Sequence, residues 1–201
     1  MARRNQHDRE TLSLLAIEAV RDLVAEQGPA RLSVRKVADR IGYAPGMLYH
    51  LFANLDELIL HANAVTLDQL LDTLDTVTDQ PPGRALGAMA REYLALAQAQ
   101  APLWQLVFSH RMQRAAPVPD WYQQRTRALF ARVEAQMMRV CPCRDPAAVH
   151  LGARTLWSSV HGICVLAVEN KLTVTGEVDA RIMLDSLVHH YLASWASGDA
   201  S

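Results

Sequence analysis

One short segment of the chain concentrates side chains that can contact nucleic acid. Residues 33–58 read SVRKVADRIGYAPGMLYHLFANLDEL. The segment begins with two cations, Arg35 and Lys36, whose charge suits phosphate oxygens. Tyr49 and His50 follow, and their ring atoms and hydrogen-bonding groups can reach the edges of bases. These residue types predict recognition of a nucleic acid rather than catalysis.

Two short helices around a glycine turn would position these side chains. The first is capped by Ser33 and has the i, i+3, i+4, i+7 spacing of one apolar face at Val34, Val37, Ala38 and Ile41. Gly42 can adopt the left-handed backbone that ends a helix, and Pro45 suits the first turn of the next. Such a turn of about three residues is typical of a helix-turn-helix. Asn54 and Glu57 then form a capping box for a third helix.

The second helix separates a buried side from an exposed one. Leu48 and Phe52, at i and i+4, can face the core. Ala44 is a poor N-cap, so the N–H groups of Gly46 and Met47 are expected to remain available to a phosphate. The candidate nucleic-acid contacts of both helices are Arg35, Lys36, Ala44, Pro45, Gly46, Met47, Tyr49 and His50.

Residues 12–60 resemble the TetR family of transcriptional repressors. The family signature runs from T-V-R-x-V-A through G-V-S-x-G-x-L-Y-x-H-F to x-K-x-E-L, and the resemblance implies that residues 44–52 are the recognition helix. The chain departs from the signature at Ala44, where a serine or threonine is common, and at Leu55, where a phosphate-binding lysine is common. At these two positions the resemblance therefore does not by itself imply the backbone contacts that are common in the family.

The resemblance also implies a mechanism. A homodimer would bind a near-palindromic operator in double-stranded DNA, repress transcription, and be released by a small, largely apolar effector. An enzyme is the competing class of protein. The chain contains no phosphate-cradling glycine loop, no Gly-x-Ser-x-Gly elbow and no HExxH pair, so we expect no catalytic site.

Composition favours a helical protein with weak overall charge. The 201 residues are 50% apolar and 6% aromatic, and no alternating strand pattern persists, which predicts an all-α fold. The formal net charge is −1, so any DNA binding must rest on local charge. A solvated helix face explains that charge equally well. The basic residues concerned are Arg31, Arg35, Lys36 and Arg40, with Arg3 and Arg4 near the N-terminus.

The helical pattern divides the chain into two domains. Residues 1–55 would form a three-helix DNA-binding bundle, and residues 56–201 a helical domain for effector binding and dimerisation. The helix that Asn54 caps, which is the fourth of the whole chain, is predicted to run to about residue 79, where D-Q-P-P-G breaks the pattern. Further helices are predicted over residues 84–100, 102–114, 119–140, 146–170 and 179–196.

The last two predicted helices carry more apolar surface than one small domain needs to cover. A helix that is apolar on so many sides should be buried on both. In the TetR family the last two long helices pair with their copies in a four-helix bundle, which implies a homodimer here. The candidate interface residues are Gly152, Leu156, Ser159, Ile163, Leu184, Leu187, Val188 and Tyr191.

Aromatic and methionine side chains gather in the second half of the chain and predict an effector cavity. Ordinary helix packing explains each of them taken singly. Trp157, His161 and Gly162 also resemble the W-x-x-x-H-G signature of one C-terminal domain class within the family, and His161 can bond either a ligand or a backbone carbonyl. The candidate ligand-binding residues are Trp104, Phe108, Met112, Trp121, Met137, Trp157 and His161.

Cys141 and Cys143, with His150 one helix away, leave open a metal or thiol sensor. Two thiols fall short of the ligand set of a zinc site, and a loop with incidental cysteines explains them too, so no metal and no cofactor is predicted. The longest apolar stretch, residues 163–168, is far below the roughly 20 residues that cross a bilayer. We therefore expect no membrane partner, and the odd number of cysteines together with the lack of a signal-peptide pattern predicts a cytoplasmic protein. An interaction module built on the same scaffold, without DNA, also remains open.

Overall fold

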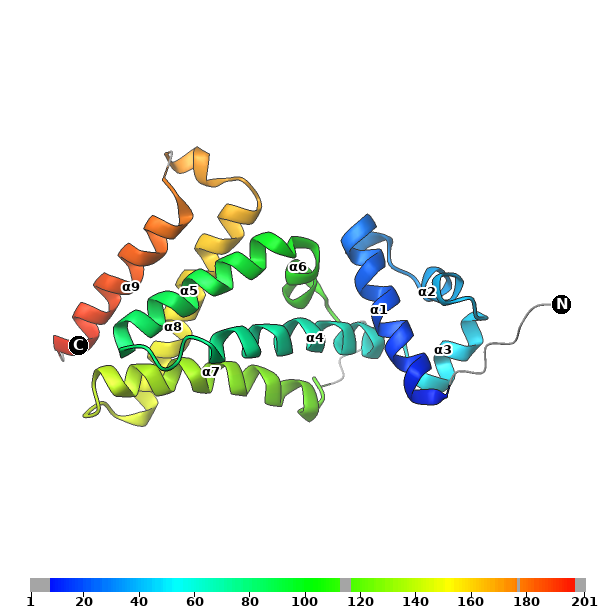
Figure 1. Cartoon of the computed structure of the whole chain (residues 1–201), viewed down its shortest axis with the longest axis horizontal. Coiled ribbons are helices and arrows are strands. Elements are labelled where there is room, and N and C mark those ends of the chain that lie inside the picture. Colours follow the sequence, from blue (N-terminus) through cyan, green and yellow to red (C-terminus); the bar gives the residue numbers. More distant parts are fainter. Residues whose placement is uncertain (1–7, 113–116, 177, 198–201) are drawn as a thin grey trace. The chain divides into compact units, whose positions relative to one another are not determined.

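The structure, a computed structural model, describes residues 8–112, 117–176 and 178–197. Within these ranges every regular element is a helix (Figure 1). The all-α fold class predicted from the sequence is therefore confirmed. Arg3 and Arg4, which the sequence proposes as basic residues of an N-terminal arm, lie outside the described residues.

The chain forms two compact units. Unit 1 comprises Met1–Thr66 and Pro102–Val118, and unit 2 comprises Leu67–Ala101 and Pro119–Ser201. Helix α4 (Leu55–Asp75) contributes its first part to unit 1 and its last part to unit 2. The domain boundary proposed from the sequence coincides with the start of α4. The boundary between a DNA-binding and an effector-binding domain stays a prediction. The compact unit 1 extends past residue 55 to Thr66.

Unit 1 is built around one apolar core. Besides the first part of α4, its helices are α1 (Arg9–Gln27), α2 (Val34–Ile41), α3 (Pro45–Leu51) and α6 (Ala101–Ser109), with a short 3-10 turn at Pro29–Arg31. The predicted bundle lacks α6, which contributes Leu103 and Leu106 to this core. The buried residues that form this cluster include Ala16, Ala19, Val20, Leu23, Val24, Val37, Ala38, Leu48, Phe52, Leu58, Ile59, Ala62, Leu103 and Leu106.

The local signals read from the sequence of unit 1 form as predicted. The Ser33 hydroxyl accepts the Lys36 N–H at 3.3 Å and caps α2. Gly42 ends α2 in the left-handed region, at φ 76° and ψ 31°. Asn54 Oδ1 accepts the Glu57 N–H at 2.8 Å, and the Glu57 carboxylate accepts a backbone N–H in return at 2.6 Å. The donor of this return bond is Ala53, the residue before the cap, so the start of α4 forms a close relative of the capping box.

Unit 2 is organised around helix α5 (Pro82–Ala99). This helix packs against α7 (Asp120–Val140), α8 (Pro146–Val168) and α9 (Ala180–Ser197). Another 3-10 turn, Leu172–Thr175, lies between α8 and α9. The sequence predicts burial of α8 on two sides, but within one chain α8 buries a single stripe. That stripe consists of Val149, Gly152, Ala153, Leu156, Val160 and Cys164.

Two helices end earlier than predicted. Helix α4 ends at Asp75, because the backbone tightens into turns in which Thr76 and Val77 donate to carbonyls three residues back. Helix α6 ends at Ser109, and part of its predicted extension to residue 114 lies outside the described residues. The other helix limits differ from the predicted ones by a few residues, as expected for helix ends.

Helices α8 and α9 run antiparallel (Figure 1), and Gly152 of α8 lies directly against the Trp195 side chain of α9. The Tyr191 hydroxyl donates to the Gly152 carbonyl at 3.0 Å. The Trp195 indole covers Gly152 and donates from Nε1 to the Met137 carbonyl at 3.3 Å. The end of α9 is therefore held against both α7 and α8 by one tryptophan.

Among the described residues, α8 is the one helix whose length and apolar composition would allow it to cross a membrane. This is weak evidence, since a core helix of a soluble protein has the same properties. Within unit 2, α8 contacts three other helices, α5, α7 and α9.

Replacement of Gly152 by alanine tests the close packing of α8 and α9. A Cβ atom at this position would lie 2.7 Å from Trp195 Cζ3 and 2.8 Å from Met137 Cε. We expect Gly152→Ala to lower the free energy of unfolding by about 1 to 3 kcal/mol, measured by denaturant titration. Gly162→Ala in the same helix meets nothing within 4 Å and should keep or slightly raise stability. Equal losses in both variants would contradict the packing.

Candidate nucleic-acid interface

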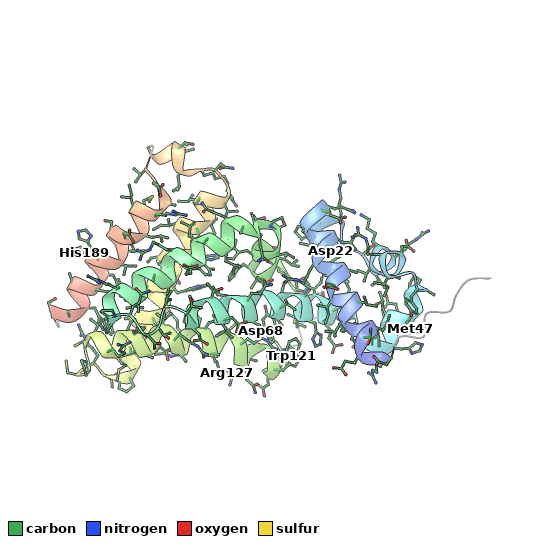
Figure 2. All side chains as sticks on the ribbon, in the orientation of Figure 1. Asp22, Met47, Asp68, Trp121, Arg127 and His189 are labelled. Carbon is green, nitrogen blue, oxygen red and sulfur yellow. The ribbon has the colours of Figure 1, made fainter. Side chains whose placement is uncertain are left out.

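Helix α3 presents one side to solvent and is anchored by the other. Leu48 is 3% exposed and Phe52 is 5% exposed, so both lie in the core of unit 1. Tyr49 is 58% exposed, and Figure 2 shows Met47 projecting from the helix. The exposed residues on or beside α3 are Ala44, Pro45, Gly46, Met47, Tyr49 and His50. The structure thus brings six of the eight predicted nucleic-acid contacts onto one accessible surface.

The backbone at the start of α3 is less available than the sequence suggests. Ala44 makes no side-chain cap, as expected. However, the Met47 N–H donates to the Ala44 carbonyl at 2.9 Å. The expectation that the Met47 N–H is available to a phosphate is therefore wrong, because this turn of backbone already satisfies it.

Helix α2 supplies the remaining two predicted contacts, Arg35 and Lys36, whose side chains differ in exposure and in hydrogen bonding. The Arg35 side chain is 86% exposed and lies 3.9 Å from the Asp39 carboxylate. Lys36 is half-buried and donates from Nζ to Gln27 Oε1 at 2.7 Å. At these exposures both side chains can exchange their partners for a phosphate at little cost.

Arg40 is engaged within the protein. Its guanidinium forms a fork with the Glu26 carboxylate of α1, at 3.0 and 2.6 Å. The same hydrogen bonds hold the pKa of Glu26 below its ordinary value. The positive charge on the surface of α2 is therefore weaker than the number of its basic residues suggests, because Glu26 on the preceding helix neutralises Arg40.

The predicted ligand-binding residues fall into both units. Trp104 and Phe108 belong to unit 1, where their rings pack edge to face with centroids 5.4 Å apart. Met112 follows the end of α6 in the same unit. In unit 2, Met137 is completely buried and packs against Trp195, so it fills the core.

Four rings in unit 2 form what we term the aromatic cluster: Tyr93, Phe130, Trp157 and His161. Trp157 stacks on His161 with centroids 5.1 Å apart and meets Phe130 edge to face at 5.5 Å. The Tyr93 hydroxyl lies 2.8 Å from His161 Nδ1. Burial lowers the pKa of His161, so the ring favours its neutral form. Tyr93 escaped prediction because it comes from α5, far from the tryptophan and histidine in sequence.

Trp121, another predicted ligand residue, lies at the start of α7. Its ring packs against Tyr122 and beneath the Arg125 guanidinium, 5.5 Å from the ring centroid. Arg125 in turn forms a fork with Asp68 in the last part of α4, with Nε 2.9 and 3.1 Å from the two carboxylate oxygens. Trp121 therefore packs against Arg125, the residue that joins α7 to α4 through Asp68.

A second fork lies further along the same two helices. Arg132 holds Asp75 with two hydrogen bonds of 2.9 Å and lowers the pKa of that carboxyl group. Gln136 and Arg139 then donate to the Thr78 carbonyl at 3.0 Å. The last part of α4 is thus held to α7 at Asp68 and Asp75, and the turn that follows α4 is held to α7 at Thr78.

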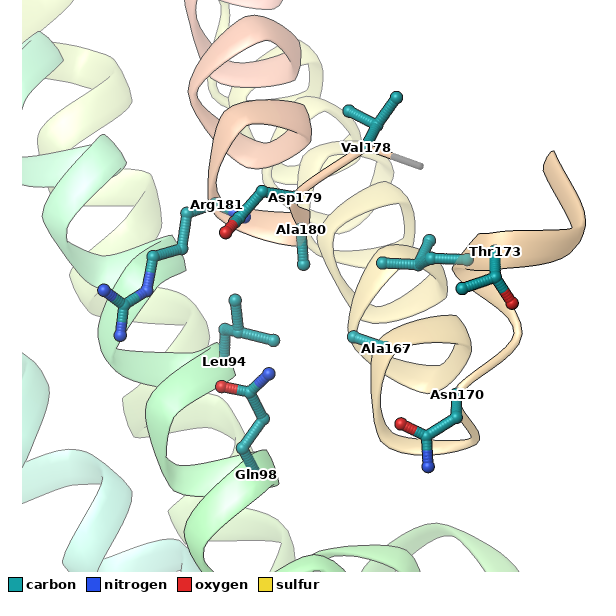
Figure 3. Close-up of a pocket in the computed structure, with 10 residues that line it drawn as sticks. Leu94, Gln98, Ala167, Asn170, Thr173, Val178, Asp179, Ala180 and Arg181 are labelled. Atoms are coloured by element: carbon teal, nitrogen blue, oxygen red, sulfur yellow. The ribbon is translucent and has the colours of Figure 1, made fainter. Parts of the chain in front are cut away.

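We describe two surface cavities of unit 2, and none of the predicted ligand-binding residues lines either of these two. The first, of about 400 Å³, lies between α5, the end of α8 and the start of α9 (Figure 3). Figure 3 shows Gln98 and Arg181 lying at its wall near Leu94. The second, of about 480 Å³, lies between α5 and α9, where Arg91 pairs with Asp185. Both are open grooves with mixed polar and apolar walls.

The residues predicted at a dimer interface divide by burial. Gly152, Leu156, Leu184 and Val188 are buried by contacts within their own chain. The side chains of Leu156, Leu184 and Val188 therefore face the interior of unit 2, where Gly152 also lies. Half-buried positions on α8 and α9 are Ser159, Ile163, Leu187 and Tyr191.

Comparison with known proteins identifies the class to which this arrangement belongs. The sequence profile described as bacterial regulatory proteins of the tetR family matches residues 16–62, which include α2 and α3. The profile described as the tetracyclin repressor-like C-terminal domain matches residues 86–191, more than half of the chain. The chain therefore belongs to the TetR family of bacterial regulatory proteins. No curated protein sequence is significantly similar to it.

Solved structures share the fold at low sequence identity. A tetR-family transcriptional regulator from Streptomyces coelicolor matches with a TM-score of 0.70 and 18% identity, over 94% of this chain and 84% of its own. BioQ, solved with its double-stranded DNA operator, gives 0.64 and 20% over 94% and 99%. RolR, solved with the ligand resorcinol, gives 0.65 and 15% over 96% of both chains.

The environment of His161 predicts a dependence of stability on pH. Because burial lowers the pKa of this ring below its ordinary 6.5, the unfolded chain takes up the proton at a higher pH than the folded chain. The stability conferred by the neutral ring is fully present above the unfolded pKa and declines as the pH falls toward the folded pKa. Between about pH 7 and pH 5, we expect His161→Gln to lose less melting temperature than the wild type.

Tyr93→Phe is the matched control, since it removes the hydroxyl contact but keeps the buried ring. Its melting temperature should fall with pH as steeply as that of the wild type. Identical pH profiles for the wild type and His161→Gln would show that this histidine does not titrate differently on folding.

Proposed function

We propose that this protein is a cytoplasmic, ligand-responsive repressor that binds a near-palindromic DNA operator as a homodimer. The observation that carries the proposal is the geometry of α3. Leu48 and Phe52 anchor a helix whose other side exposes Met47, Tyr49 and His50. Two such helices, about 34 to 36 Å apart in a dimer, would enter successive major grooves. The fold likeness to BioQ, solved with its operator DNA, supports this reading.

Each exposed group has a distinct proposed role. Tyr49 and His50 contact base edges, and Met47 packs against a thymine methyl group. Arg35 and Lys36 contact phosphates, aided by the exposed backbone around Ala44, Pro45 and Gly46. Phosphate contacts set affinity and its salt dependence, whereas base contacts set the preference for one sequence.

Dimerisation would use the outward side of α8 and α9. Leu151 on α8 is 68% exposed and Ile182 on α9 is 64% exposed, which is unusual for large apolar side chains on structured helices. The exposed residues that follow Leu151 on α8 are the small Thr155, Ser158 and Gly162, and small side chains at a contact let two helices approach closely. The half-buried Ser159, Ile163, Leu187 and Tyr191 from the predicted interface would complete this surface.

The effector would be a small, largely apolar molecule that contacts the aromatic cluster. Stacked Trp157 and His161 offer an apolar wall with a polar handle supplied by Tyr93. RolR, which shares the fold, was solved with resorcinol, a small aromatic compound. The predicted contacts Trp104, Phe108, Met112 and Trp121 remain proposals, whereas the buried Met137 would support the site only indirectly.

Transmission to DNA would run through α4. Phe130 and Trp157 of the cluster pack together, and α7, which carries Phe130, holds the last part of α4 through Arg125 and Arg132. A ligand that favours one position of α7 would therefore also shift α4, whose first part belongs to unit 1. Coupling of this kind is typically worth about 1 to 3 kcal/mol between the two sites.

DNA recognition is tested by fluorescence anisotropy with labelled DNA from immediately upstream of the protein's own gene, against shuffled DNA, across a salt series. We expect selective binding that weakens steeply with salt. Combined Tyr49→Ala and His50→Ala changes should abolish the preference. Arg35→Gln should weaken binding to both DNAs and lower the salt slope by about 1.

Arg127→Gln is the matched control for loss of one exposed cation. Arg127 lies on α7 in unit 2, where its side chain is 61% exposed and pairs with Asp120 (Figure 2). Its removal should leave affinity and salt slope unchanged. Unaltered operator binding by the double variant of Tyr49 and His50 would refute the recognition-helix assignment. Equal weak binding of both DNAs by the wild type would favour an interaction module.

The dimer is tested by sedimentation velocity at micromolar concentration. We expect the wild type to sediment as a dimer and Leu151→Arg to shift it toward monomer, because an arginine would place a charge within an apolar interface. Leu14→Arg is the control, since Leu14 on α1 is 61% exposed and chemically identical. A monomeric wild type, or equal effects of the two changes, would contradict the proposed interface.

A further inference from the structure

Two thiols meet at the turn between α7 and α8. Cys141 caps the end of α7, where its N–H donates to the Met137 carbonyl at 3.1 Å, and Cys143 follows Pro142 in the turn. The two Sγ atoms are 3.0 Å apart, and both cysteines are free. A disulfide needs about 2.0 Å, so a movement of about one ångström would join them. Cys141 is buried and Cys143 is exposed, so the pair opens to solvent on one side.

The surroundings make one of these thiols a better nucleophile than the other. The hydrogen bond with Cys143 holds the pKa of Cys141 below its ordinary value, and the nearby Arg144 guanidinium adds to the effect. The same contact raises the pKa of Cys143. In contrast, burial raises the pKa of Cys164 to about 12. Since the thiolate is the reactive form, the pair has an attacking thiol and a resolving thiol.

A metal ion fits this pair poorly. Among the described residues, no three His, Cys, Asp or Glu side chains come together as metal ligands. A zinc site requires about four ligands, whereas a disulfide requires the two sulfurs alone.

We propose that Cys141 and Cys143 form a redox-active dithiol that closes to an intrachain disulfide when it meets a hydroperoxide. The Cys141 thiolate attacks one peroxide oxygen and becomes a sulfenic acid, and with hydrogen peroxide the other oxygen leaves as water after taking up a proton. The Cys143 sulfur then attacks the Cys141 sulfur, forming the S–S bond and releasing a second water. Two thiols are thereby oxidised by two electrons, and one peroxide is reduced to two waters.

The position of the pair connects this chemistry to helix α9. The Arg144 N–H donates to the Cys141 carbonyl at 3.3 Å, so Arg144 belongs to the same turn. Its guanidinium donates to the Trp195 carbonyl at 3.0 Å and lies over the Trp195 ring, 4.8 Å from the centroid. Closure of the disulfide rearranges the turn that holds Arg144 and therefore alters its grip on the end of α9.

The test begins with the reduced, full-length chain. It is treated with hydrogen peroxide, its remaining thiols are alkylated, and the peptides are analysed by mass spectrometry. We expect the peptide with residues 141–143 to lose two hydrogen atoms, to escape alkylation at both cysteines, and to recover both thiols after reduction. Cys164→Ser should react in the same way. Cys143→Ser should instead leave Cys141 as a sulfenic acid that dimedone captures.

Arg144→Gln tests the positioning of the attacking thiol through a pH profile. We expect the midpoint for alkylation of Cys141 to move to higher pH. Arg139→Gln is the control, because Arg139 donates to Thr78 and Gln136. The proposal is overturned if both thiols stay alkylatable while glutathione in the same solution is oxidised, or if the disulfide joins two chains. It is also overturned if Arg144→Gln and Arg139→Gln give the same profile.

Discussion

Burial of Leu48 and Phe52 is the interaction on which the candidate nucleic-acid interface depends. Helix α3 has only 7 residues, and helices of that length are not stable alone in water. Its conformation and orientation are therefore imposed by the core of unit 1, in which both anchors lie. Once these two side chains are fixed, helical geometry leaves Tyr49 and His50 on the accessible side. The proposed recognition surface of α3 therefore depends on the apolar packing of Leu48 and Phe52 on the opposite side of the helix.

Helix α4 belongs to both units, so it connects the core that anchors α3 with unit 2. Its first part adds Leu58, Ile59 and Ala62 to the core of unit 1. Its last part is held by two arginines of α7, which form hydrogen-bonded ion pairs with Asp68 and Asp75. Because these ion pairs are partly exposed, each contributes little stability and can rearrange at low cost. A continuous helix that is anchored by apolar contacts at one end and by adjustable polar contacts at the other suits a regulatory role.

Local chemistry explains which parts of this protein could be predicted. Ser33, Gly42 and the Asn54–Glu57 pair act on their own stretch of backbone, and each forms the cap or turn that its residue type favours. The division of α3 into anchors and exposed residues follows from helical spacing. In contrast, the neutralisation of Arg40 by Glu26 and the pairing of Tyr93 with His161 join different helices, so no local pattern reports them.

The sequence by itself determined the all-helical class, the approximate helix limits and the residues that α3 exposes, because backbone preference and apolar periodicity are local properties. Only the tertiary structure decided that α6 completes the core of unit 1, that Leu184 and Val188 face the interior of their own chain, and that Cys141 and Cys143 meet at 3.0 Å. An apolar stripe shows that a helix must be covered, but not what covers it. The partner is chosen by the packing of the whole unit.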